Sequence, residues 1–447
     1  MNKKFTYFIL VALFIATTAF VVIQYKGNMK KGFVAFYPLQ ERAGAAALLP
    51  EWAATKTKGA ELIRIVRESP EDTKSAIALA TVYIQEARVT GNYTYYDAAA
   101  MKYIEDVLVR EPQNFEALVL KALLQLSQHH FTEALATASQ ASLLNPYNAF
   151  IQGIMVDANV ELGRYDSAVQ HADRMISIRP DLRSYSRVAY LREIHGDYAG
   201  AIEAMKLAVD AGSYGDEPTA WARIQLGRLY EQTGDLRSAE MHYTIADEQR
   251  PGYGYALAGL GSVELGEGDF NKSITLYKKA AAAVSDYALK EQLARLYLLT
   301  GNKEQATVVL NQVIAELQKA SEEGEGSINH HADKELADVY LLIEKPEEAL
   351  KHALAEYNRR PGNIDVNEAV ARSYYKLGNI EKALPYLEKA LRTGSKNPAL
   401  LCHAGLIYAK AGNSKLSAQL LSSVLKGSPN IDPLLKKESE SALQKLQ

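Results

Sequence analysis

The chain has 447 residues, and its 50 basic and 53 acidic side chains leave a net charge of −3. This balance argues against a broad polyanion-binding surface, so nucleic acid is not an expected partner. Cys402 is the single cysteine, which excludes an intrachain disulfide. The length exceeds one ordinary globular core, yet no Pro/Gly/Ser-rich linker divides the chain, which favours a fold that grows in one dimension.

The first predicted element is an uncharged run from Phe5 to Ile23 that follows Lys3 and Lys4. A helix of this length spans roughly 28 Å, close to the thickness of a bilayer core. Residues 1–30 are therefore expected to be a signal anchor or signal peptide, with an uncleaved anchor favoured, and residues 31–54 a juxtamembrane linker. The lysines that flank the run are nearly balanced, so they leave the topology open. The repeat domain is expected outside the cytoplasm, in the periplasm or cell envelope.

From about residue 55 the spacing of large and small residues recurs with a period near 34, and Ala220 to Tyr253 is the clearest copy. Its pattern residues are Leu226, Gly227, Tyr230, Gly234, Ala239, Tyr243, Ala246 and Pro251. Small residues at these positions let two antiparallel helices approach closely, the tyrosines fill the space between them, and the proline ends the second helix. A fixed period of this length predicts stacked helix pairs that contact only their neighbours.

This pattern resembles the tetratricopeptide repeat at every one of those positions. Two longer motifs, which begin at Tyr83 and Ser184, look like those of a bacterial subfamily with many such repeats, membrane-anchored or exported. The resemblance implies an all-α, right-handed superhelical solenoid and a scaffold role, and it implies no catalytic residues. The solenoid is expected over residues 55–431, where a partial helix near Thr55 to Arg67 is followed by about ten units, the first of which begins near Thr73. Residues 432–447 are expected to form a polar C-terminal capping helix.

Three insertions interrupt the period. The first, Val89 to Tyr96, is Tyr-rich and is expected between the two helices of the first unit. The second is Ser213 to Thr219, and the third, Lys319 to Asn329, is acidic. Repeat proteins often place specific contacts on such loops. For the first insertion a contact is favoured, because exposed tyrosines without a partner are unusual. For the third, a solvated connection is favoured.

The family resemblance implies that the first helix of each unit lines the concave side of the superhelix. Charged residues at the positions that point there are mixed in sign, which suits an extended peptide or a helix carrying both charges and apolar anchors. Aromatic residues with neighbouring arginines are typical of binding hot spots, although inter-repeat packing is the more frequent role of such aromatics. The partner-binding candidates are Phe150, Arg183, Tyr190, Trp221, Arg228, Tyr255, Arg295, Arg372, Tyr375 and Lys376.

Catalytic, cofactor-binding and metal-binding residues are not predicted. The pairs His129–His130 and His330–His331 are adjacent in sequence, and neighbours on a helix point about 100° apart and seldom chelate one metal. Phosphate-binding glycine loops followed by Lys-Ser/Thr and HExxH motifs are absent from the sequence. The glycines of the segment that begins at Gly252 mark a repeat junction.

Two functions remain open. The favoured one is a non-enzymatic, membrane-anchored scaffold that binds an unidentified protein or peptide in its concave groove. The alternative is a carrier or accessory subunit of an envelope enzyme complex that binds a small molecule or glycan, for which the only motive is the excess of 27 tyrosines over 10 phenylalanines.

The assigned register predicts that Ala239→Leu overpacks one helix pair. The added side-chain volume should lower the free energy of unfolding by roughly 1 to 3 kcal/mol. Urea unfolding followed by circular dichroism measures the change, and a variant as stable as the wild type would show that the register is wrong.

Overall fold

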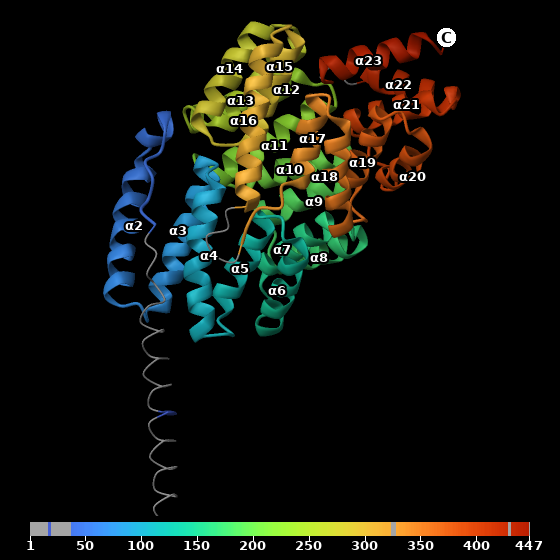
Figure 1. Ribbon diagram of the computed structural model, residues 1–447. Helices are drawn as coiled ribbons and strands as arrows, with labels where there is room; N and C mark the ends of the chain where they lie inside the picture. Colours follow the sequence, from blue (N-terminus) through green and yellow to red (C-terminus); the bar gives the residue numbers. More distant parts are fainter. Residues whose placement is uncertain (1–16, 19–36, 323–327, 428–430, 447) are drawn as a thin grey trace, which may run out of the picture.

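The computed structural model describes residues 17–18, 37–322, 328–427 and 431–446, and all its regular elements are helical (Figure 1). A short 3-10 helix η1 (Gly44–Leu48) and helix α2 (Pro50–Glu68) precede the repeats, and helix α23 (Pro433–Gln444) follows them. No helix among the described residues is long and apolar enough to cross a membrane. The predicted anchor, Phe5 to Ile23, lies outside the described residues except for Thr17 and Thr18.

Twenty helices between these ends form ten antiparallel pairs, so the expected all-α repeat architecture is confirmed for the described chain. The first five pairs are α3 (Thr73–Thr90) with α4 (Tyr93–Arg110), α5 (Phe115–Ser127) with α6 (Phe131–Leu144), α7 (Ala149–Glu161) with α8 (Tyr165–Ile178), α9 (Leu182–Ile194) with α10 (Tyr198–Asp210), and α11 (Glu217–Gln232) with α12 (Leu236–Gln249). The second five are α13 (Gly254–Glu267) with α14 (Phe270–Ala283), α15 (Tyr287–Leu299) with α16 (Lys303–Glu322), α17 (Asp333–Leu342) with α18 (Pro346–Arg359), α19 (Ile364–Lys376) with α20 (Ile380–Ala390), and α21 (Pro398–Lys410) with α22 (Ser414–Gly427).

Close packing within a pair depends on the small residues of the repeat. Ala239 is fully buried, and a Cβ added at Gly227 would lie 2.5 Å from the ring of Tyr243. The turn between the two helices places one residue in the left-handed region, Gly234 at φ +87° in this unit, and the Asp235 side chain then caps α12 by accepting from the Ser238 amide. Each pair therefore forms from local signals that lie within its own 34 residues.

The segment before the repeats is packed against the first pair. Arg42 is buried and forms a bidentate ion pair with Glu86 of α3, with distances of 2.6 and 2.9 Å, and a third hydrogen bond to Glu51. Trp52 is buried beneath the Arg42 guanidinium, 5.0 Å from the ring centroid. Residues 37–54, which the sequence suggested to be linker, therefore form the N-terminal cover of the solenoid, and α2 begins five residues before the expected helix.

The prediction of an inserted loop at Val89 to Tyr96 is wrong. These residues extend α3 and α4 to 18 residues each, around a tight turn at Gly91, where φ is +71°. Their tyrosines pack against the N-terminal segment: the Tyr95 hydroxyl donates to the Pro38 carbonyl at 2.7 Å, and the Tyr96 hydroxyl accepts from the Gln40 amide at 3.0 Å. The N-terminal segment thus covers these tyrosines, and no separate partner is needed to shield them from solvent.

The other two insertions also extend helices in part. The second leaves residues 211–216 as a connection, and its last three residues, 217–219, form the first turn of α11. The third prolongs α16 to Glu322, and residues 323–327 lie outside the described chain. Ile328, which follows, is buried in the apolar core of the first repeat. The acidic insertion therefore ends in a packed contact with a distant part of the solenoid.

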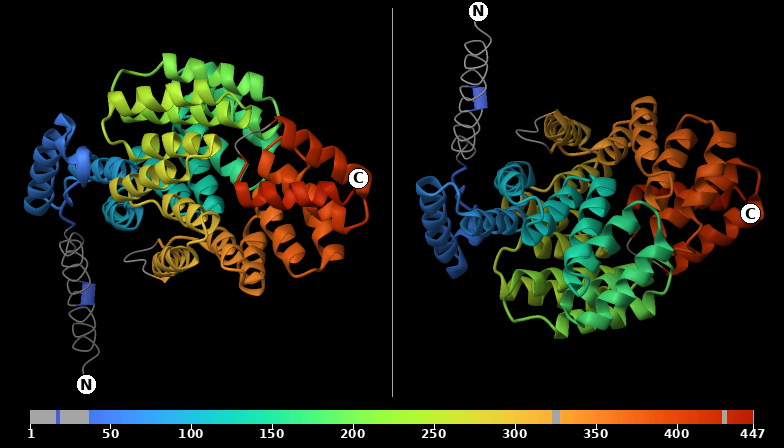
Figure 2. Two further views of the ribbon diagram at one scale, coloured as in Figure 1. Left: turned by 90° about the horizontal axis from the view of Figure 1, so that it is seen from above. Right: turned by 90° about the horizontal axis from the view of Figure 1, so that it is seen from below.

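Successive turns of the superhelix touch along a continuous seam. The tight turns within repeats 1–4 meet the junctions that lie about six repeats later. Figure 2 shows the superhelix from above and from below. Most contacting residues are about 200 positions apart, as in the ion pair of Arg250 with Glu51, 199 positions apart, and the hydrogen bond from Asn363 to the Glu161 carbonyl, 202 positions apart. We call these contacts the inter-turn seam.

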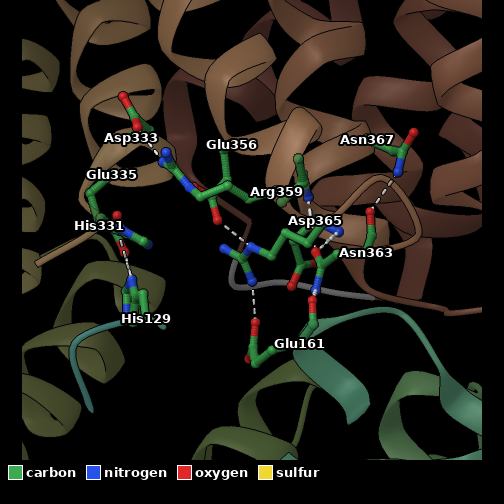
Figure 3. Close-up of polar contacts among 12 residues, drawn as sticks. His129, Glu161, His331, Asp333, Glu335, Glu356, Arg359, Asn363, Asp365 and Asn367 are labelled. Atoms are coloured by element: carbon green, nitrogen blue, oxygen red, sulfur yellow. Dashed lines mark hydrogen bonds and ion pairs between the residues drawn. The ribbon is translucent and has the colours of Figure 1, made fainter. Parts of the chain in front are cut away.

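The most polar part of the seam surrounds Arg360, which is buried between two acidic side chains. It directly follows α18, and it pairs with Glu161 at the end of α7 and with Glu356 of α18 (Figure 3). Beside it, the Ile364 amide donates to the Tyr165 hydroxyl at 3.0 Å. A buried arginine with two carboxylates and adjacent backbone bonds fixes the position of one turn on the next.

The seam predicts that two chemically identical substitutions differ in effect. Gly163 and Gly378 occupy the same turn of their repeats with φ of +71° and +74°, so alanine strains the backbone of each by about 1 to 2 kcal/mol. A Cβ at Gly163 would in addition collide with the Gly362 carbonyl, whereas nothing lies within 4 Å at Gly378.

Gly163→Ala should therefore lower the unfolding free energy by roughly 1 to 3 kcal/mol more than Gly378→Ala. Thermal unfolding measures the difference, and small-angle scattering of the folded proteins tests whether the turns separate. Equal effects of the two substitutions would contradict the seam.

Candidate functional site

The first helices of the repeats lie on the inner side of the superhelix. Neighbouring first helices contact one another, as α5 does α7, α11 does α13 and α17 does α19. In a curved stack, equivalent helices of consecutive repeats lie closer together on the concave side than on the convex side. First helices that contact one another therefore lie on the concave side. All ten predicted partner-binding residues belong to these first helices, α7, α9, α11, α13, α15 and α19.

Charged side chains on this inner face are paired between consecutive repeats. A cation on one first helix binds an acidic side chain on the preceding first helix, about one repeat earlier in the chain. The pairs are Arg187 with Asp157, Arg228 with Glu193, and Arg372 with Asp338, at 2.6 to 2.9 Å. His403 lies in the same position relative to Glu368, with its Nδ1 2.6 Å from the Glu368 Oε1. The mixture of signs that the sequence predicted is thus a ladder of ion pairs, which we call the inner ladder.

Arg228 shows how strongly these charges are held. Its two terminal nitrogens donate to the two Glu193 oxygens at 2.7 and 2.6 Å, and its Nε donates to Gln225 at 3.1 Å. Burial alone would lower the pKa of Arg228, but the Glu193 carboxylate raises it well above its usual value. Glu193 itself is buried, and a buried carboxylate needs a partner. The pair therefore contributes to the stability of the inner face and also forms part of its surface.

Asp338 connects two repeats in the same way. It accepts from Lys334 at 2.8 Å on its own helix and from Arg372 at 2.9 Å on the next first helix. Burial opposes ionisation of this carboxyl, but the charges of Lys334 and Arg372 lower its pKa. The carboxylate is therefore ionised throughout the neutral range and holds Arg372 in place.

Four of the predicted aromatic residues differ in how much of their side chain is exposed to solvent. The Tyr190 side chain is the most accessible of them, because Tyr190 is 39% exposed on α9. Trp221 packs partly against the apolar core shared by repeats 4 and 5, and the Tyr255 hydroxyl donates to Asp286 at 3.1 Å. Phe150 lies 4.9 Å below the guanidinium of the exposed Arg183. Tyr190 and the Phe150–Arg183 stack are thus the most available apolar contacts.

The C-terminal helix holds the other candidates. Glu438 of α23 accepts from the Tyr375 hydroxyl at 3.1 Å and from Lys376 at 3.2 Å. Asp432, which caps the same helix, lies 3.6 Å from Arg295, which also pairs with Glu291. The capping helix therefore occupies part of the inner face at this end. A partner that binds Tyr375 and Lys376 would compete with Glu438.

A histidine cluster that sequence reasoning missed lies on the inter-turn seam. The ring centroids of His129 and His330 are 4.4 Å apart, and those of His130 and His331 are 3.8 Å apart. The doublet His129–His130 therefore contacts the doublet His330–His331 of the next superhelical turn. Glu335 in the first turn of α17 lies beside them, with its Oε1 3.5 Å from His129 Nδ1 (Figure 3). Burial lowers the pKa of His330 to about 3, so its imidazole is neutral.

Backbone strain accompanies this cluster. His129 has φ of +63° at the turn position that glycine occupies in most other repeats, and a left-handed residue with a Cβ costs about 1 to 2 kcal/mol. A histidine doublet at each end of a 200-residue interval was the only sequence signal. Only the number of repeats in one superhelical turn shows that the two doublets lie side by side, and the sequence does not give that number.

An open hollow of about 620 Å³ lies away from the inner face, at the N-terminal end. It is lined by residues of the N-terminal segment and of α2, among them Leu39, Ile63, Arg64 and Arg67. Its walls combine apolar side chains with two arginines, a composition that suits a small ligand with an acidic group.

Comparison with known proteins supports the repeat assignment. A family model described as tetratricopeptide repeat matches residues 224–288 and 369–430, which are repeats 5 to 6 and 9 to 10. The mouse (Mus musculus) protein Tetratricopeptide repeat protein 21B is 20% identical over 313 residues, which cover 68% of this chain and 22% of that protein. The chain thus spans about a fifth of the length of this curated relative.

The chain is also similar to solved structures. A human IFIT1 dimer with PPP-AAAA is 16% identical, with 77% of this chain and 80% of that chain covered and a TM-score of 0.48. TTC0263, a thermophilic tetratricopeptide repeat protein of Thermus thermophilus, is 21% identical, with 43% and 99% covered and a TM-score of 0.39. The family model falls on helix pairs with the residue pattern and turn geometry derived above, so residues 224–288 and 369–430 are tetratricopeptide repeats.

Proposed function

We propose that this chain is a non-enzymatic scaffold that binds a peptide or protein segment along its inner face. The observation that carries the proposal is the combination, on one continuous row of first helices, of the inner ladder with accessible aromatic side chains at Tyr190 and Phe150. In this proposal Phe5 to Ile23 anchors the protein in a bacterial membrane and the repeats lie in the periplasm or cell envelope. The basic residues and the apolar run at the N-terminus support the anchor itself.

The inner ladder restricts the chemistry of the ligand. A strongly acidic ligand would have to separate Arg187, Arg228 or Arg372 from a carboxylate that already holds it, so nucleic acid is disfavoured. A segment that carries both signs can bind beside such pairs without breaking them, and its apolar side chains can pack on Tyr190. We therefore infer a ligand with mixed charges and at least one apolar anchor.

A small-molecule or glycan carrier remains the second candidate, and the hollow between the N-terminal segment and α2 is the observation that favours it. The tyrosines of residues 89–96 do not support it, because the hydroxyls of Tyr95 and Tyr96 are hydrogen-bonded to the N-terminal segment. Melting temperatures across a metabolite and glycan panel test this candidate, and a uniformly flat response would remove it.

A photo-crosslinking residue at position 190 should trap the partner in intact cells. Tyr147, which is 79% exposed in the junction before α7, is the matched control because it is an accessible tyrosine outside the inner helices. Adducts should form at position 190 and not at position 147, and they should fractionate with membranes.

With the partner in hand, Tyr190→Ala should weaken binding about tenfold, as expected for a hot-spot aromatic residue. Tyr147→Ala should leave the dissociation constant unchanged. A fully soluble protein with no adduct at position 190 would count against both the anchor and the binding face.

Arg228 tests whether the inner ladder is structural. Arg228→Met leaves the buried Glu193 carboxylate without its partner, so the free energy of unfolding should fall by about 1 to 3 kcal/mol. Arg64→Met breaks an exposed pair with Glu68 and should cost less than about 1 kcal/mol. Chemical unfolding compares the two variants, and an equal cost would mean that the ladder adds nothing to stability.

A further inference from the structure

The histidine cluster on the inter-turn seam has the composition of a transition-metal site. His129, His330 and Glu335 each offer one ligand atom, and these atoms all lie within 4.8 Å of one another. Two imidazoles and one carboxylate form a ligand set that proteins use for Zn²⁺, whereas Mg²⁺ and Ca²⁺ prefer oxygen ligands alone.

Several polar atoms of this cluster have no hydrogen-bond partner within the part of the chain that the structure describes. They are buried and comprise His330 Nε2, His331 Nδ1 and Glu335 Oε2. Glu335 is only 8% exposed, and its other oxygen, Oε1, accepts from the Tyr287 hydroxyl at 3.2 Å. Buried polar atoms are nearly always satisfied in native proteins, so this group requires an explanation. One cation bound to His330 and Glu335 would satisfy an atom of each.

The surroundings hold the candidate ligands from both sides of the seam. His129 Nδ1 lies 3.1 Å from the His331 carbonyl oxygen, and His130 Nε2 lies 2.7 Å from the Asn329 carbonyl oxygen. The His331 amide in turn donates to the Gln128 carbonyl at 3.1 Å. The backbones of the two turns are thus already fixed to each other on both sides of the cluster.

The backbone at His129 is a second, independent observation. The equivalent turn position is a left-handed glycine in repeats 1, 3, 4, 5, 6, 7, 9 and 10, from Gly91 to Gly412. Repeats 2 and 8 are the exceptions among the described turns, with His129 at φ +63° and Glu344 at φ +56°. Glu344 is exposed to solvent, whereas the His129 ring points into the cluster beside Glu335. Backbone strain at a residue whose side chain can bind a metal is typical of a functional site.

From these contacts we propose that His129, His330 and Glu335 bind a zinc-type divalent cation that joins the first and second turns of the superhelix. Ligand atoms about 2.1 Å from one metal ion are at most about 4.2 Å apart, so the three side chains must close by roughly 1 Å on binding. His130 or His331 or a water molecule completes the coordination. The ion links the turn between α5 and α6, in repeat 2, to the start of repeat 8, where His330 precedes α17 and Glu335 lies in its first turn, and so fixes the pitch of the solenoid.

Titration of the tag-free, EDTA-treated full chain with ZnCl₂, followed by calorimetry, tests the proposal. One ion per chain should bind, Co²⁺ should give a visible absorption band that Zn²⁺ displaces, and the unfolding temperature should rise with Zn²⁺. His330→Gln and Glu335→Gln should each weaken binding by about tenfold or more. A wild-type chain that binds neither ion at micromolar concentration would overturn the proposal.

His129→Gly separates loss of the ligand from loss of the fold. Glycine suits the left-handed backbone, so this variant should unfold in EDTA at or above the wild-type temperature, yet bind Zn²⁺ at least about tenfold more weakly. Glu344→Gly relieves the same strain away from the cluster and should keep wild-type affinity. Unchanged affinity in His129→Gly, His330→Gln and Glu335→Gln together would place any bound zinc elsewhere and refute the site.

Discussion

The inter-turn seam is the interaction on which the architecture of this protein depends. A stack of helix pairs is held together by contacts between neighbours, and by itself such a stack can stretch or coil with little resistance. Here the ion pairs of Arg360 and Arg250, together with backbone bonds such as that from Ser285 to Thr90, join parts of the chain about 200 residues apart. These contacts fix the pitch of the superhelix. The fixed pitch in turn determines where the inner helices lie relative to one another.

The inner face combines stability with recognition in the same residues. Glu193 and Asp338 are held by cations of the following repeat, so the charges that line the concave side also tie consecutive first helices together. Accessible aromatic groups remain between these pairs, and the capping helix covers Tyr375 and Lys376 at one end. The surface offered to a ligand is therefore narrower than the list of inward-facing residues suggests.

Local features of the fold could be predicted from the sequence, and long-range ones could not. The Gly-Asp turn at Gly234 and the small residues at Gly227 and Ala239 act within one repeat, so their spacing predicts each helix pair. The Tyr-rich segment was mistaken for a loop because the residues that cover Tyr95 and Tyr96 precede the repeats. The ten inner residues were assigned from pattern positions, but their ion-pair partners and the histidine cluster depend on the small rotation from each repeat to the next. That rotation accumulates over six repeats, and no local pattern encodes it.

The constant interval between contacting residues bears on how this family can change its length. In an open solenoid a unit can be duplicated or lost in the middle, because each new neighbour resembles the old one. In this chain an extra unit between Glu161 and Arg360 would bring every later junction opposite the wrong turn, and the buried arginine would face a different repeat. Duplication is compatible with the seam only beyond the last pair. The seam therefore fixes the number of units that can lie between two contacting turns of this chain.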